Sequence, residues 1–242
     1  MRPRAVQGES AVAGGFGTVN TQYVSGWRER TDDTRPMWAL NLMRYRPIAQ
    51  YPDGRVSTLT GQQADDLYRP DEQLAKVGAK GVLLAPVVHQ LVGDGARWDR
   101  VAIARYPSRV AQLDMQMLPD FQERVIHKRA GMEFTIVLAT FLPDDAPPAP
   151  AGVGEAPLLL VQVVGDPDAP DVAADIDATP IAVFDVEDRI IGDERRYAQA
   201  RWHMVSAAVG DELRRRPRVH DPVTYSLLIQ PERNLLAEAF AK

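Results

Sequence analysis

The chain contains four histidines and no cysteine, and these counts limit the metal and redox chemistry open to it. Without cysteine, thiolate catalysis, disulfides and sulfur-ligated metal or iron–sulfur sites are excluded. His89, His127, His203 and His220 fall on separate expected elements, and no His-x-x-x-His pair occurs. The spacing therefore predicts no metal site and no tightly bound cofactor.

One group of titratable residues falls on an expected hairpin in the second half of the chain. Alternation places Asp185 and Glu187 on one face of its first strand, and Arg201 and His203 on one face of the next. With the turn centred near residues 193–194, Glu187 faces Arg201 and Asp185 faces His203. A carboxylate beside an imidazole can tune a general base, but such clusters are more often surface ion pairs, and we favour the ion pairs.

The corresponding hairpin in the first half is far more apolar, and an apolar cavity with a few polar groups is the usual form of a small-molecule site. In that half, alternation can turn several polar or aromatic side chains toward one cavity. We expect His127 to transfer a proton and Asn41 and Arg105 to polarise an oxygen. The expected substrate contacts are Tyr45, Trp98, Tyr106 and His89. Structural roles remain open for Asn41, through a backbone hydrogen bond, and for Trp98, as a core residue.

Composition limits the class of protein and its partners. The 242 residues are 45% hydrophobic and 25% charged, with a net charge of -5, and acids and bases are mixed along the chain. This mixture argues against a protein that follows nucleic-acid phosphates. No segment approaches the roughly 20 apolar residues of a membrane span, and the start does not resemble a signal peptide. We therefore expect a cytoplasmic protein with no nucleic-acid or membrane partner. Its expected partner is a small hydrophobic ligand, and a homodimer remains open.

An internal repeat determines the expected organisation. Gly93, Asp94 and Trp98 recur as Gly192, Asp193 and Tyr197, all at an offset of 99 residues. A repeat of this kind indicates a duplicated structural unit. The predicted organisation is an arm at residues 1–35, a first unit at 36–143, a Pro-rich linker at 144–156 and a second unit at 157–242.

Hydrophobic periodicity predicts the same order of elements in both units. In the first unit we expect strands at 37–45, 81–92, 98–106 and 132–141, with helices at 61–77, interrupted by Pro70, and from Ser108 to Phe121. In the second unit we expect strands at 158–164, 181–191 and 224–230, a hairpin partner that includes 201–204, a short helix at 171–176 and a helix at 207–215. The order βαββαβ predicts an α+β fold of two tandem ferredoxin-like units. Because each sheet keeps one apolar face, the two units are expected to pack face to face as an intramolecular α/β barrel.

Several stretches of the first unit carry a family resemblance. They are Arg44 with residues 40–42, 98–99, 105–108 and 127–131, within the span 37–143. The chain resembles the dimeric α/β-barrel superfamily, which includes antibiotic-biosynthesis monooxygenases and NIPSNAP-like proteins, and is most similar to its uncharacterised branch. Cofactor-free oxygenases of that superfamily hold aromatic substrates with Asn, Trp, Tyr and Arg or His, and the residues proposed above match those types.

The resemblance implies a small-molecule enzyme without a tightly bound cofactor. The expected chemistry is of oxygenase type, or acid–base chemistry like that of an isomerase or cyclase, on a hydrophobic aromatic or polyketide-like compound. Two other functions remain open. One is a non-catalytic ligand-binding or structural barrel, which the weakly polar site and the divergent second unit suit. The other is a haem-binding tandem barrel, which the resemblance in overall plan allows.

Overall fold

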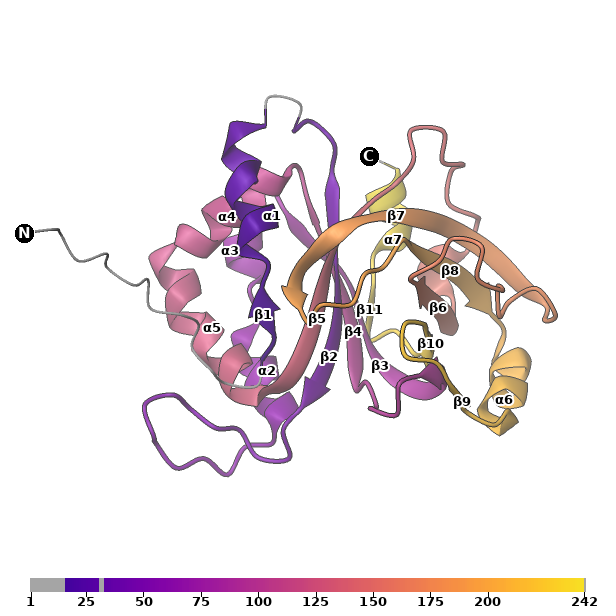
Figure 1. Ribbon diagram of the computed structural model, residues 1–242, viewed down its shortest axis with the longest axis horizontal. Coiled ribbons are helices and arrows are strands. Elements are labelled where there is room, and N and C mark those ends of the chain that lie inside the picture. The colour runs from indigo at the N-terminus through magenta and orange to yellow at the C-terminus, as the bar shows by residue number, and fades with distance from the viewer. Residues whose placement is uncertain (1–15, 31–32, 242) are drawn as a thin grey trace, which may run out of the picture.

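A computed structural model describes residues 16–30 and 33–241 of the chain (Figure 1). Residues 1–15 of the predicted arm lie outside the described residues. The strands are β1 (Thr18–Val19), β2 (Met37–Tyr45), β3 (Lys80–Gly93), β4 (Arg100–Tyr106), β5 (Met132–Phe141), β6 (Leu158–Val164), β7 (Ala178–Gly192), β8 (Gln199–Val205), β9 (Val219–His220), β10 (Tyr225–Ile229) and β11 (Arg233–Asn234). The α-helices are α1 (Thr21–Ser25), α2 (Gly61–Tyr68), α3 (Asp71–Lys76), α4 (Arg109–Met117), α5 (Pro119–Gly131), α6 (Ala207–Arg215) and α7 (Leu236–Phe240).

Eight of the strands form one closed antiparallel barrel. Their order around it is β7, β5, β2, β4, β3, β10, β6 and β8, and pairing of β8 with β7 closes the ring. The prediction of two tandem ferredoxin-like units is therefore wrong. Strands from the two halves of the chain hydrogen-bond directly, β5 to β7 and β3 to β10. This pairing satisfies the edges that separate sheets would leave open.

Side-chain alternation along the strands separates two packed layers. In β2, Trp38, Leu40 and Leu42 point into the barrel, where they join apolar side chains from the other strands. Met37 and Ala39 point outward and pack against side chains of the helices. Asn41 is the next outward-facing residue of β2, so its side chain points into the space between the barrel and the helices. Figure 1 shows these helices, α2 to α5, gathered on one side of the barrel.

Two glycines bring α2 against the end of α5. A Cβ atom added at Gly61 would lie 2.3 Å from the carbonyl oxygen of Gly131, so only residues without a side chain fit this contact. The preceding Thr60 caps α2 by accepting a hydrogen bond from the Gln63 backbone, and the Gln63 side chain accepts one from the Thr60 backbone. The start of α2 is therefore capped locally and fixed against the end of α5.

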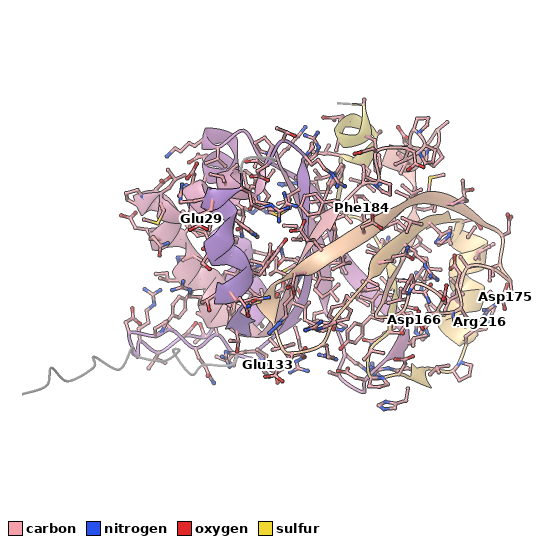
Figure 2. All side chains as sticks on the ribbon, turned by 45° about the horizontal axis from the view of Figure 1, so that its top comes forward. Glu29, Glu133, Asp166, Asp175, Phe184 and Arg216 are labelled. Carbon is pink, nitrogen blue, oxygen red and sulfur yellow. The ribbon has the colours of Figure 1, made fainter. Side chains whose placement is uncertain are left out.

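In the second half of the chain a loop replaces the first helix. The short helix expected at 171–176 is absent, and residues 165–177 form turns that are held by side chains of the barrel. Arg201 donates hydrogen bonds to the carbonyl oxygens of Pro167 and Ala169. Figure 2 shows Arg216 beside Asp175, an ion pair of 3.3 Å that ties α6 to this loop.

The cross-strand pairs predicted for the second hairpin are wrong. Asp185 pairs with Gln199, and Arg201 pairs with Val183. Arg201 therefore lies opposite a residue four positions earlier in β7 than predicted. Glu187 instead contacts Arg109 of α4 and Arg30 of the N-terminal segment.

The N-terminal segment packs on the outside of the barrel. Trp27 is 1% exposed and its ring meets that of Tyr23 edge to face. Behind them Arg109, itself buried, forms ion pairs with Asp33 and Glu187. These contacts attach the described part of the predicted arm to α4 and β7.

Candidate functional site

A cavity of about 500 Å³ lies between the outer face of the barrel and the helices of the first half. Its floor is formed by outward-facing residues of β2 and β4, and its walls by α2, α3 and α5. Part of the wall comes from the C-terminal segment, where β11 pairs with β3. The volume falls within the usual range for small-molecule sites, roughly 300–1,000 Å³.

The floor of the cavity combines polar and apolar groups that strand pairing places side by side. Asn41 pairs with Ala102, and Met43 with Arg100, across β2 and β4. Tyr106 of β4 lies on the same face as these four residues, and all five line the cavity. The Oδ1 atom of Asn41 is buried and has no hydrogen-bond partner among residues 16–30 and 33–241. A buried unpaired acceptor is costly, so this atom is available to a ligand donor.

Asp65 of α2 places a carboxylate in the wall of the cavity. The residue is 8% exposed, and its Oδ2 accepts a hydrogen bond of 2.7 Å from the Tyr45 hydroxyl. Its Oδ1 has no hydrogen-bond partner in the described structure, although Nζ of Lys128 lies 3.5 Å away. One oxygen is therefore oriented and the other remains able to accept a proton.

Arg100 links three parts of the molecule at the edge of this cavity. Its guanidinium, 4% exposed, donates to Asp66 at 2.8 Å and to Glu232 at 3.2 Å, and lies 3.8 Å from Asp65. Burial alone would lower the pKa of Arg100, but the surrounding Tyr45, Asp66 and Glu232 raise it, so this side chain stays charged. It thereby holds α2 and the C-terminal segment to β4.

The tyrosines around the cavity stay protonated. Burial raises the pKa of Tyr45, and the neighbouring Asp65 carboxylate raises it further. Burial likewise raises the pKa of Tyr68 and of Tyr106. Their hydroxyls are therefore hydrogen-bond donors, and the rings of Tyr68 and Tyr106 give the cavity aromatic walls.

Only part of the predicted site comes together. Asn41 and Tyr106 line the cavity, and Tyr45 contacts its wall through Asp65. Arg105 precedes Tyr106 in β4, so its side chain points to the opposite face, the interior of the barrel. Its guanidinium lies over the Trp38 ring, 5.6 Å from the ring centroid.

The other predicted residues lie elsewhere. His127 of α5 shares a hydrogen bond of 2.8 Å between its Nδ1 and the Tyr51 hydroxyl. Burial, and then the charges of Arg55 and Arg124, lower its pKa, which favours the neutral ring. Trp98 lines a separate, smaller cavity of about 240 Å³. His89 lies on β3 opposite Leu228 of β10.

The residues that sequence reasoning missed are charged: Asp65, Arg100 and Lys128, with Glu232 from the C-terminal segment. The sequence of α2, residues 61–68, contains one signal that could have identified Asp65. Asp65 follows Ala64 and precedes Tyr68 by three residues, so it lies on the face of the helix that packs inward. An acidic residue on a packing face needs a partner. The contribution of Glu232 depends on the pairing of β11 with β3, which has no local sequence signal.

The histidines do not suit a haem or metal site. Across the described ranges, no group of three or more His, Asp or Glu side chains is arranged to hold a metal ion. Neither cavity described above is lined by a histidine, so the residues present do not fit a histidine-ligated haem. No helix in the described part of the chain is long and apolar enough to cross a membrane.

Comparison with known proteins gives few matches. No protein-family model matches the chain, and no curated protein matches it. Among solved structures, it is similar to RPA0582, a protein of unknown function from Rhodopseudomonas palustris, with 31% identity and a TM-score of 0.45 over 51% of this chain and 94% of that one. The methylated RPA0582 protein matches at 31% identity and a TM-score of 0.48, over 55% of this chain and 98% of that one. The resemblance to the dimeric α/β-barrel superfamily therefore stays a prediction.

Proposed function

We propose that the protein is a small-molecule enzyme that binds its substrate between the barrel and helices α2, α3 and α5, and that Asp65 transfers the proton. The observation that carries the proposal is the buried Oδ1 of Asp65, which has no hydrogen-bond partner among the described residues and lies in the wall of a ligand-sized cavity. The proposal moves the proton-transfer role from His127, which lies outside this cavity, to the carboxylate.

The surroundings of Asp65 support acid–base chemistry. Tyr45 fixes the carboxylate through Oδ2, and Lys128 provides a positive charge 3.5 Å from Oδ1. A proton taken from the substrate would reside on Oδ1, and Lys128 or Asn41 can then stabilise charge that develops on a substrate oxygen. This division assigns one group to proton transfer and others to polarisation, as an isomerase or cyclase requires.

The walls support an apolar substrate body. The rings of Tyr68 and Tyr106 and the side chains of Met43 and Leu74 face the cavity. Aromatic and thioether side chains pack well on flat apolar ligands. The substrate proposed is therefore a partly aromatic molecule with a hydroxyl or amide hydrogen for the Oδ1 of Asn41.

The test compares the wild type with Asp65→Asn in an extract of small metabolites from the native host. Asparagine has nearly the same shape and can still accept the hydrogen bond from Tyr45, but it cannot take up a proton at neutral pH. Mass spectrometry before and after incubation shows which compounds are consumed, and equilibrium dialysis shows which are bound. The matched control is Asp145→Asn, on an exposed loop.

We expect the wild type and the control to convert a compound that Asp65→Asn binds but converts at least about 100-fold more slowly. Equal conversion by Asp65→Asn would refute the assigned role. Loss of conversion in His127→Gln, with Asp65→Asn active, would support the role predicted from the sequence. A compound bound by all variants and converted by none would favour the non-catalytic binding protein.

A further inference from the structure

We propose that the substrate of this cavity carries a carboxylate and that Arg69, at the rim, receives it. This inference rests on the proposed function, because it requires the space between the barrel and the helices to be a ligand site. It adds the chemical class of the substrate and a residue that determines specificity.

The backbone of Arg69 is the first support. Its φ is 24° and its ψ 78°, and it is the only non-glycine residue with a positive φ in the described ranges. A side chain in this region crowds the neighbouring backbone, so the position favours glycine. Such strain tends to persist where a side chain has a function. At the junction of α2 and α3, this chain has the largest cationic side chain where the smallest residue would fit best.

The ion pairs around the cavity are the second support. Lys128 lies near Asp65, and Arg100 holds Asp66 and Glu232. The remaining cavity carboxylate, Asp71, accepts hydrogen bonds of 2.6 and 3.1 Å from Arg233. Every carboxylate of the lining is therefore matched with a cation other than Arg69.

Arg69 itself forms no hydrogen bond and no ion pair with any residue in the described ranges, although it lines the cavity and is exposed. It does act on Asp71 at longer range. The pKa of Asp71 is lowered first by the hydrogen bond from Arg233, and to a smaller extent by the charge of Arg69. A guanidinium with free donors at the mouth of a site can bind a carboxylate through two parallel hydrogen bonds.

The position of Arg69 relative to Asp65 gives the bound substrate a direction. Asp65 lies in α2, Arg69 directly follows the last residue of that helix, and both residues line the cavity. Asp65 is buried and Arg69 is exposed. A substrate whose carboxylate binds Arg69 would therefore direct its other end inward toward Asp65.

A matched pair of probes tests the carboxylate preference: 4-hydroxybenzoate and 4-hydroxybenzamide, which differ in charge but little in shape. Nuclear magnetic resonance titration at low ionic strength measures the affinity of each for the wild type and for Arg69→Ala. We expect the wild type to bind the carboxylate about tenfold more tightly than the amide. Arg69→Ala should bind the two about equally.

Arg69→Gly tests the strain through its thermal stability and the selectivity through the same pair of probes. Glycine removes the side chain that crowds the backbone, so its Tm should rise by about 2–4 °C while the carboxylate preference is lost. Arg69→Ala keeps a Cβ atom at positive φ and should gain little. If the strained backbone at Arg69 is retained because its side chain binds the substrate, Arg69→Gly should gain stability and lose selectivity.

Equal affinity of the wild type for the two probes, or a preference that survives in Arg69→Ala, would overturn the role of Arg69 and leave the proposed function intact. Failure of both probes to bind the wild type at millimolar concentration would count against the cavity as a ligand site, and so against both proposals. A Tm for Arg69→Gly at or below the wild-type value would refute the claim of strain.

Discussion

Replacing Arg100 with methionine tests whether the buried guanidinium holds the cavity together. The variant keeps an unbranched side chain of similar length but removes the cation that Asp65, Asp66 and Glu232 share. Asp66 and Glu232 have side chains that are 43% and 46% exposed, so water can take over part of their solvation. The Asp65 side chain is only 7% exposed and keeps Lys128 at 3.5 Å.

The magnitude follows from these exposures. Removing one partner of a buried ion pair costs about 3–5 kcal/mol, whereas an exposed pair contributes about 0–1 kcal/mol. Because only one of the three carboxylates of Arg100 is buried, we expect a loss near the lower limit, about 3 kcal/mol. For a chain of this size, that corresponds to a Tm lower by about 6–12 °C.

Urea denaturation at neutral pH measures this loss against a matched control. Arg233→Met removes an ion pair with Asp71 whose side chains are 36% and 48% exposed, so it should cost less than about 1 kcal/mol. If Arg100→Met cost no more than Arg233→Met, the reasoning from burial would be refuted. In the double variant Arg100→Met with Asp65→Asn, part of the loss should be recovered, because a neutral amide then replaces the buried carboxylate that lost Arg100.

Two further predictions concern other parts of the barrel. Burial raises the pKa of Asp94 and of Asp193, but hydrogen bonds, including those from Arg195, outweigh burial and lower both pKa values overall. Their stabilising contribution is therefore complete above the unfolded pKa of about 3.9 and is lost as pH falls through the lower folded values. Arg195→Met should lower the Tm at pH 6, and its difference from the wild type should shrink as pH falls below about 3.9; a difference that is constant with pH would contradict this. Gly61→Ala should lower the free energy of unfolding, measured by urea denaturation, by about 1–3 kcal/mol, because its Cβ would meet Gly131. The control is Gly26→Ala, whose Cβ meets nothing within 4 Å and which should leave the stability unchanged. Equal losses in the two variants would contradict the close contact at Gly61.

Local sequence patterns predicted many of the elements. The strands β2, β5 and β6 and the helix α6 have the predicted bounds, because each is a short run of apolar or helix-forming residues between clear breaks. Pro70 was correctly identified as the interruption between α2 and α3. These signals depend on neighbours in sequence, which a single chain displays directly.

The barrel and the site depend on pairings that local patterns do not contain. Alternation predicts that Asn41, Arg105 and Tyr106 can all turn toward one cavity, and of these Asn41 and Tyr106 line it. It gave no information that β5 would pair with β7, or that Glu232 would reach Arg100. His127 was selected for its chemistry, but its position on α5 turns it to Tyr51, whereas the next residue, Lys128, faces the cavity.

Barrel closure also has a consequence for synthesis of the chain. Gln90 of β3 pairs with Leu227 of β10, which follows it by 137 residues. At a translation rate of about 5–20 residues per second, this edge of β3 waits roughly 7–27 s for its partner. During that time the nascent chain exposes an apolar strand edge that can join another copy. Because β10 is synthesised late, we expect chaperones to bind the partly translated barrel. Rapid synthesis of the last quarter of the chain would shorten this exposure.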